Sequence, residues 1–447
     1  MCSFLFTNLL DIDIDFINRI LKRRGPDATN YKIINEFLFL HNLLSLCGDF
    51  TIQPFQKDGV VCLFNGEIYN YKSFGDYKSD GEIIIDMYLK YGYFFPRFFN
   101  GEYTFIIVDL NNSEIILYSD TFATKPLFYS LEDGKVGISS YKSVLKELGL
   151  KKIERLDPNT FLVIDSKELN IKNKSSIYSF DLKQYKKTFD DFNVAFERSI
   201  KNRVEGVKSK IHVCLSSGYD SGAICAGLNN LGIEYKTFTI DSCENREILE
   251  KRLKINNREY STYQGNDIDI NLHSQILKEL DQDYIIKWNN KNERLYNFVE
   301  DKASLALSHI YTISSSEGYK VVLSSQGADE IFGDYGFNGK KLVFHSCFGG
   351  KYPSKLEEIF PKNPNDNEAI WDNFYSGTQK CFMSKEEFVG GNYGIETRYP
   401  FLDRDLVQEF LWLDVSLKNS SYKSAVESYL KKNNYPYDKN VKLGFVF

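Results

Sequence analysis

The hydrophobic pattern of this chain changes once, near residue 180, and that change constrains the fold more than any other feature. Before it, short runs of aromatic and β-branched residues alternate with turns, as in antiparallel sheets. These runs cover 37–44, 59–65, 103–110 and 113–120. After it, helical stretches such as 189–206 alternate with short apolar runs, as in parallel α/β folds. Those runs cover 210–215, 235–241 and 319–323. Because the polar, lysine-rich stretch 166–187 lies between the two patterns, the sequence predicts a β-rich domain at 1–180 and a parallel-sheet α/β domain at 181–447.

Composition limits the classes of function. The chain has 447 residues and a net charge of −6, with no dense block of lysine and arginine, so generic nucleic-acid binding is not expected. No apolar run approaches the ~20 residues that span a bilayer, and the first residues carry no basic leader. The eight cysteines form no CxxC pair, and no histidine spacing indicates a zinc site. We expect a cytoplasmic enzyme that acts on small molecules, away from membranes and nucleic acids.

Cys2 is the first residue with a chemical interpretation. If Met1 is removed, the thiol lies beside a free α-amino group with a pKa near ~7.7, which can take the thiol proton and return it. Nucleophile and base would then share one residue. A cysteine at position 2 has little meaning alone, so the prediction depends on the segments that accompany it.

Several segments of the first domain are similar to glutamine amidotransferases of the N-terminal nucleophile class, and in particular to the glutamine-hydrolysing half of asparagine synthetase. They cover 1–3, 24–27, 64–70, 79–82 and 120–129. The resemblance implies a four-layer αββα sandwich in which Cys2 attacks the glutamine amide. It also implies that Asn65 and Gly66 stabilise the oxyanion while Glu67 and Asp80 bind the α-amino group. Taken alone, Asn65-Gly66 would instead indicate a hairpin turn.

Leu43 departs from this resemblance. The family motif has an arginine at this position, which pairs with the glutamine α-carboxylate, whereas here the stretch is His41-Asn42-Leu43-Leu44-Ser45. A carboxylate without its bidentate partner should bind less tightly by several kcal/mol. Three explanations stay open: another cation replaces the arginine, the amide donor is not glutamine, or the domain is weak and uses free ammonia.

A strand–loop–helix pattern at 210–230 indicates a phosphate site. The small residues 216–222 follow an apolar run and precede a helix, which directs backbone N–H groups at an anion. The Walker pattern and a GxGxxG turn are both absent. A Ser/Gly-rich connector is the alternative. The loop resembles the Ser-Gly-Gly-x-Asp-Ser loop of ATP pyrophosphatases, with Ser217 in place of the first glycine.

Three later segments extend the resemblance to the synthetase half of asparagine synthetase. They are 324–335, 394–403 and 441–445. The resemblance implies a parallel-sheet ATP-pyrophosphatase domain in which Asp220 and Asp329 share a Mg²⁺ ion and Lys442 acts on the pyrophosphate or acyl phosphate. The ATP-binding residues it implies are Leu215, Ser216, Ser217, Gly218, Asp220, Ser221, Ile240, Ser324 and Ser325.

The predicted function is ATP-dependent amide formation on a carboxylate, with ammonia drawn from glutamine and with AMP and pyrophosphate released. Aspartate is the default acceptor, which would place the protein in asparagine biosynthesis. Gln326, however, stands where the family has a glutamate, so the alternative is the same chemistry on a uronic acid or a modified metabolite. A second alternative is a non-catalytic protein that binds ATP or glutamine, although such a protein would need no nucleophile. The resemblance also allows a homodimer.

Overall fold

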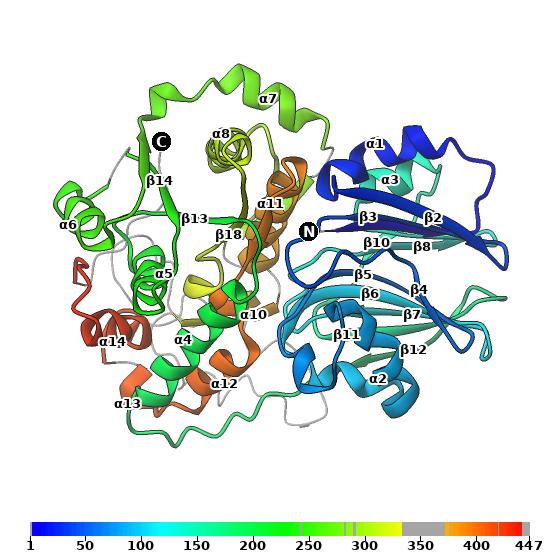
Figure 1. Cartoon of the computed structure of the whole chain (residues 1–447), viewed down its shortest axis with the longest axis horizontal. Coiled ribbons are helices and arrows are strands. Elements are labelled where there is room, and N and C mark those ends of the chain that lie inside the picture. Colours follow the sequence, from blue (N-terminus) through cyan, green and yellow to red (C-terminus); the bar gives the residue numbers. More distant parts are fainter. Residues whose placement is uncertain are drawn as a thin grey trace. The chain divides into compact units, whose positions relative to one another are not determined.

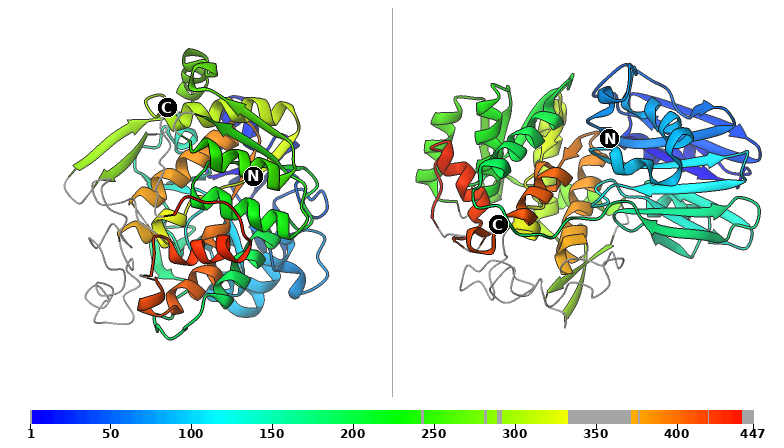
Figure 2. Two further views of the ribbon diagram at one scale, coloured as in Figure 1. Left: turned by 90° about the vertical axis from the view of Figure 1, so that its left-hand side faces the viewer. Right: turned by 90° about the horizontal axis from the view of Figure 1, so that it is seen from below.

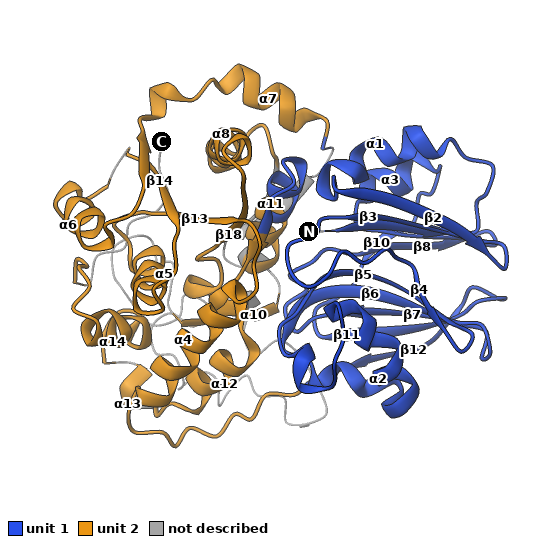
Figure 3. Cartoon of the chain, in the orientation of Figure 1, with its two compact units in different colours: residues 1–178, 280–282, 387–396 blue, residues 179–279, 283–386, 397–447 orange. Residues whose placement is uncertain are grey.

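The computed structural model describes residues 2–241, 244–280, 283–288, 292–332, 372–375, 377–418 and 420–439. The chain forms two compact units (Figures 1 and 3). Unit 1 comprises residues 1–178, 280–282 and 387–396, and unit 2 comprises 179–279, 283–386 and 397–447. The late segment 387–396 therefore packs with the first part of the chain.

Unit 1 contains two six-stranded sheets whose printed pairings are antiparallel. The first has the order β10 (Ile153–Arg155), β8 (Phe128–Glu132), β9 (Lys135–Ser139), β1 (Ser3–Thr7), β3 (Phe37–Leu43) and β2 (Ala28–Ile34). The second has the order β12 (Ile171–Ser176), β11 (Thr160–Asp165), β7 (Glu114–Ser119), β6 (Gly101–Asp109), β5 (Val60–Ile68) and β4 (Phe55–Lys57). Figure 1 shows the two sheets face to face.

Alternation along the strands builds two cores in unit 1. Phe4, Val61, Leu63 and Ile106 lie between the sheets, while the intervening residues of β5, such as Cys62, point to the outer face of the second sheet. Helix α2 (Ile83–Tyr91) covers that outer face through its isoleucines. Helices α1 (Ile14–Arg24) and α3 (Lys142–Glu147) contact β1 and β9 of the first sheet. These four layers confirm the predicted αββα sandwich.

Unit 2 is built on a five-stranded sheet. Its order is β15 (Tyr260–Tyr263), β14 (Lys236–Ile240), β13 (Lys210–Cys214), β18 (Tyr319–Leu323) and β19 (Glu396–Arg398). The pairs β15–β14, β14–β13 and β13–β18 are parallel, which confirms the predicted parallel α/β architecture. A separate hairpin pairs β16 (Asp283–Trp288) with β17 (Asn292–Asn297).

Helices surround this sheet, as the green to red ribbons of Figure 2 show. They are α4 (Asp190–Val204), α5 (Tyr219–Asn230), α6 (Arg246–Asn256), α7 (Ile270–Lys278), α8 (Lys302–Ser316), α10 (Asp372–Tyr375), α11 (Gly377–Asn392), α12 (Arg404–Trp412), α13 (Val415–Lys418) and α14 (Ser424–Lys432). The last residues of α11, from 387 onward, belong to unit 1. Asn245 and Asp269 cap α6 and α7 with their side chains, which satisfies otherwise unpaired N–H groups. Among the described residues, no helix is both long and apolar enough to cross a bilayer.

Candidate functional site

Cys2 faces the space between the two sheets of unit 1. Because side chains alternate along β1, Cys2 lies on the same face as Phe4 and Phe6, which belong to the core between the sheets. The Cys2 side chain is 7% exposed, and its Sγ lies 3.9 Å from the Leu44 carbonyl oxygen. The thiol therefore sits at the end of the sandwich interior and not on the open surface.

Asn65 approaches this space from the opposite sheet. It follows Val61 and Leu63 on the inner face of β5, and it is 0% exposed. Neither its amide nitrogen nor its amide oxygen has a hydrogen-bond partner in the described part of the chain. A buried amide without partners is costly, so Asn65 has the properties of a group kept for a ligand.

Two neighbours complete this part of the site. His41 pairs with Phe4 in the β1–β3 register, and its Nε2 lies 3.3 Å from the carbonyl oxygen of Phe64, the residue before Asn65. Burial lowers the pKa of His41 to about 3, so its ring is neutral. Gly66 has a φ of +136°, and a Cβ there would lie 2.1 Å from the Glu102 carbonyl oxygen, so only glycine fits this close approach.

Of the two carboxylates predicted to hold an ammonium group, Glu67 lies near the Cys2 thiol. The pKa of Cys2 is raised to about 11, chiefly by burial and in smaller part by the charges of Glu396 and Glu67. Burial and then the charges of Asp80, Cys47 and Glu67 raise the pKa of Tyr71, so Glu67 and Asp80 share one neighbourhood. Asp80 is fixed there because its Oδ2 accepts the Ile68 N–H at 2.8 Å. At neutral pH the thiol is therefore protonated.

Arg24 contacts the backbone of Cys2, although the sequence analysis assigned it no role. Its Nε donates to the Cys2 carbonyl oxygen at 3.0 Å, and its Nη2 donates to the Glu387 carboxylate. Glu387 also accepts from Lys125 Nζ at 2.9 Å, and all three side chains are buried. Arg24 thus holds the backbone of Cys2 through an ion network anchored in the segment 387–396. In the sequence, Arg24 is marked only by its position in the stretch 24–27, which resembles the amidotransferase family.

Leu43 lies beside Cys2, the predicted nucleophile. It is the last residue of β3, pairs with Ala28 and is buried. It directly precedes Leu44, whose carbonyl oxygen contacts the thiol. The position where the family motif has an arginine is therefore apolar and adjacent to Cys2.

In unit 2, two loops begin at the carboxyl ends of adjacent parallel strands. Strands β14 and β15 lie on one side of β13, whereas β18 lies on the other. The chain order therefore reverses between β13 and β18, and ligands of open α/β sheets bind at such a switch point. The loop after β13 contains Ser216–Gly218, and the loop after β18 contains Ser324–Gly327.

Asp220 and Asp329 converge on one lysine at this switch point. Lys423 Nζ lies 2.7 and 2.5 Å from the two Asp220 carboxylate oxygens and 2.8 Å from Asp329 Oδ1. Burial lowers the pKa of Lys423, but the charges of Asp220 and Asp329 outweigh it and raise that pKa well above its usual value. The sequence analysis missed Lys423, because nothing local to it indicates a partner about 200 residues away.

The two carboxylates have the chemistry that Mg²⁺ prefers. The Asp220 and Asp329 side chains are 19% and 24% exposed, whereas Lys423 is 2% exposed. Hard oxygen ligands on a partly open surface suit a cation that keeps waters and phosphate oxygens. No cluster of three or more His, Cys, Asp or Glu side chains suited to a metal occurs among the described residues. The residues fit a magnesium ion that arrives with a phosphorylated substrate.

The loop after β13 is held by its own hydroxyl groups. Ser216 Oγ lies 2.9 Å from Ser221 Oγ and accepts the Gly218 N–H at 3.2 Å. The Ser217 N–H donates to Glu244 Oε2 at 2.6 Å, and the Ser217 hydroxyl contacts the same carboxylate. Glu244 was not predicted. Its position shows that the Ser217 N–H of this loop donates to an anionic oxygen.

The other predicted ATP-site residues lie at the same edge of the sheet. Leu215 donates its N–H to the Phe238 carbonyl oxygen at 2.9 Å, which brings it close to Ile240 at the end of β14. Ser324 Oγ accepts the Gln326 N–H at 3.0 Å, and Ser325 follows. The Gln326 side-chain nitrogen is buried and has no hydrogen-bond partner within the described ranges. Lys442 lies outside the described residues.

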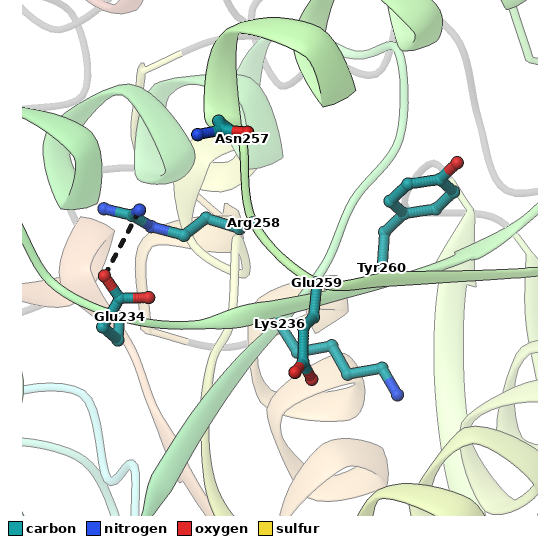
Figure 4. A pocket seen from close by; sticks show the side chains of 6 residues that line it. All are labelled: Glu234, Lys236, Asn257, Arg258, Glu259 and Tyr260. Carbon is teal, nitrogen blue, oxygen red and sulfur yellow. Dashed lines mark ion pairs between the residues drawn. The ribbon is translucent and has the colours of Figure 1, made fainter.

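A surface hollow in unit 2 lies at the opposite edge of the sheet. Glu234, Lys236, Asn257, Arg258, Glu259 and Tyr260 line it (Figure 4). These residues lie at the amino ends of β14 and β15, and Arg258 pairs with Glu234 at 3.2 Å. None of them is a predicted site residue, so the hollow is separate from the switch point.

Comparisons with known proteins match both halves of the chain. Residues 7–180 match the family model of the glutamine amidotransferase domain, and residues 191–387 match that of asparagine synthase. The asparagine synthetase [glutamine-hydrolyzing] of Gallus gallus is 24% identical over 93% of this chain and 76% of its own length. The human protein of the same name is 23% identical over the same shares. A relative from Methanocaldococcus jannaschii, named for the same enzyme, is 25% identical over 90% of this chain and 77% of its own length.

Solved structures give weaker matches. A glutamine phosphoribosylpyrophosphate amidotransferase from B. subtilis aligns with 73% of this chain and 82% of its own, at 11% identity and a TM-score of 0.34.

Proposed function

Because this chain belongs to the glutamine-hydrolysing asparagine synthetase family, we propose that it activates a carboxylate with ATP and converts it to an amide. The nitrogen would come from glutamine, and AMP and pyrophosphate would be released. The observation that carries the proposal is the convergence of Asp220 and Asp329 on Lys423, at the switch point of a parallel sheet.

Each residue of this site has a distinct task in the proposed reaction. The N–H groups of the loop after β13 and the start of α5 would bind phosphate oxygens. Asp220 and Asp329 would hold a magnesium ion, which supplies charge neutralisation on the pyrophosphate leaving group. Lys423 keeps the two carboxylates together. Leu215 and Ile240, at neighbouring strand ends, would contact the adenine, and Ser324 and Ser325 would complete the nucleotide site. Lys442 would contact the pyrophosphate.

The glutamine half would work through Cys2. Its sulfur attacks the amide carbon of glutamine, and its proton passes to an α-amino group freed by loss of Met1. Asn65, whose amide has no partner in the described chain, and Gly66 would bind the oxyanion that forms. Glu67 and Asp80 would hold the α-ammonium group of glutamine. Ammonia then leaves, and water releases glutamate from the sulfur.

The acceptor carboxylate would lie beside the loop after β18. Aspartate is the default acceptor, since the family's curated members carry the name asparagine synthetase. Gln326 favours a second candidate, because a neutral amide cannot act as a base or pair with the ammonium group of aspartate. Its buried side-chain nitrogen could instead donate to an uncharged oxygen. The second candidate is therefore the same chemistry on a hydroxyl-rich acid, such as a uronic acid, or on a modified metabolite.

The test is exchange of labelled pyrophosphate into ATP by the full chain, over a panel that contains aspartate, uronic acids and other carboxylic acids. Lys423→Met and Asp220→Asn should lose exchange. Lys432→Met, on the exposed end of α14, is the matched control and should keep it. Exchange with aspartate supports asparagine synthesis, and exchange with another acid alone supports the second candidate. No exchange with any acid would refute catalysis and favour a protein that only binds ATP or glutamine.

A further inference from the structure

Arg252 lies beneath the loop after β13 and binds its backbone. The residue belongs to α6 and is 0% exposed. Its Nη1 donates to the carbonyl oxygens of Ser216 at 2.5 Å and Gly218 at 2.8 Å. Its Nε and Nη2 donate to the Pro436 carbonyl oxygen at 2.9 and 2.8 Å. One guanidinium therefore fixes two carbonyls of the loop and one of the C-terminal segment.

Gly222 makes room for this side chain. It lies inside α5, where glycine costs about 1 kcal/mol relative to alanine. A Cβ at Gly222 would lie 2.4 Å from Arg252 Nη2 and 2.6 Å from Cζ. The glycine therefore has a packing reason, because any side chain at this position would displace the guanidinium from the loop.

The Arg252 guanidinium forms no direct ion pair in the described part of the chain, and the charges of Glu244 and Asp220 act on it from farther away. Among the described residues no carboxylate lies within ion-pair distance of it, although burial of an unpaired charge is costly. Three carbonyl oxygens and the ring of Tyr435, whose centroid lies 5.4 Å from Cζ, surround the guanidinium. Carbonyls drawn inward to Arg252 turn the N–H groups of the same loop away from it, and the positive charge lies on the side of the loop opposite to a bound anion. An anionic ligand on the loop would therefore offset the cost of burying this cation.

We propose that Arg252, accommodated by Gly222, is a positioning residue of the pyrophosphate loop that orients the loop N–H groups and adds positive potential to them. The inference rests on the proposed ATP-dependent function. It deepens that function by assigning anion affinity to a residue outside the loop, and it explains why α5 carries glycine directly after Ser221.

The test measures calorimetric affinity for Mg-ATP and for inorganic pyrophosphate in the full chain. Arg252→Gln keeps a donor but removes the charge, and it should weaken both affinities at least about tenfold. Arg252→Lys restores the charge without the fork, and it should recover part of that loss. This partial rescue would show that the positive charge itself contributes to anion binding, and not only the support that Arg252 gives to the fold. Thermal melts identify the variants that fold.

Two glycine variants of α5 provide a matched pair that leaves Arg252 in place. Gly222→Ala would press on the guanidinium, whereas Gly227→Ala would press on Ile200 Cδ1, which would lie 2.3 Å from the new Cβ. Both changes favour the helix equally, so only the first should weaken binding of Mg-ATP and pyrophosphate. If Arg252→Gln or Gly222→Ala binds within twofold of the wild type, the inference is wrong. If the wild type binds neither ligand, the proposed function fails at this loop and the inference fails with it.

Discussion

The unpartnered amide of Asn65 makes a sharp prediction about stability and activity together. Asn65→Leu replaces the amide with an apolar group of similar size. Because the amide is fully buried and has no hydrogen-bond partner in the described chain, its removal should relieve a desolvation cost of about 1–3 kcal/mol. We expect the melting temperature of unit 1 to rise by about 2–12 °C, at ~2–4 °C per kcal/mol for a unit of this size.

The same substitution should damage catalysis. Loss of one oxyanion donor typically lowers kcat by ~10²–10³-fold, so glutamine hydrolysis should nearly stop while ammonia-dependent activity persists. Rising stability with falling activity is the signature of a group kept for function at a cost to the fold. Both effects are measurable on one preparation, by calorimetric melting and by release of glutamate from glutamine.

Asn42 is the matched control, because it is equally buried and lies on the facing sheet. Its Nδ2 donates to Ser3 Oγ at 3.3 Å and Asn18 Oδ1 at 2.8 Å, and its Oδ1 accepts from Thr29 Oγ1 at 2.7 Å. Asn42→Leu loses three hydrogen bonds and should destabilise unit 1 by about 2–4 kcal/mol. If Asn65→Leu lowers the melting temperature as Asn42→Leu does, or retains glutamine hydrolysis, the assignment of Asn65 is wrong.

Three further predictions concern Leu43, Glu244 and Lys418. Leu43→Arg should raise kcat/KM for glutamine at least about tenfold by pairing with its α-carboxylate; Leu43→Met should not, and no gain in a folded Leu43→Arg variant would show that a missing clamp does not limit the reaction. Glu244→Gln should tighten calorimetric Mg-ATP binding about three- to tenfold, because a competing carboxylate leaves the Ser217 N–H; weaker binding would mean that Glu244 supports the loop. Burial lowers the pKa of Lys418 to about 7, below its unfolded value of ~10.4, so the unfolded chain binds more protons between these values. The stability of the wild type relative to Lys418→Met should therefore rise from pH 7 to pH 10, by up to about 1.4 kcal/mol per pH unit, and melts that shift in parallel would contradict this.

Much of the architecture follows from patterns that neighbouring residues carry. Alternation in β5 places Val61, Leu63 and Asn65 on one face, and this period of two is visible in the sequence. The strand, small-residue loop and helix at 210–230 likewise predict an anion site, because the residues that form it are neighbours in the sequence. The departures at Leu43 and Gln326 were also visible, because each falls inside a matched motif.

Other features of the sites required the folded chain. Lys423 meets Asp220 across 203 residues, Arg252 meets Pro436 across 184, and Glu387 meets Arg24 across 363. A long-range contact leaves no periodicity or characteristic spacing in the sequence. The sequence also does not distinguish a buried lysine, arginine or glutamate from one on the surface. Chain order and residue chemistry thus gave the predictions about which loops would bind ligands and which thiol would react. The tertiary structure decided which buried charges hold them in place, because only packing brings distant segments into hydrogen-bond range.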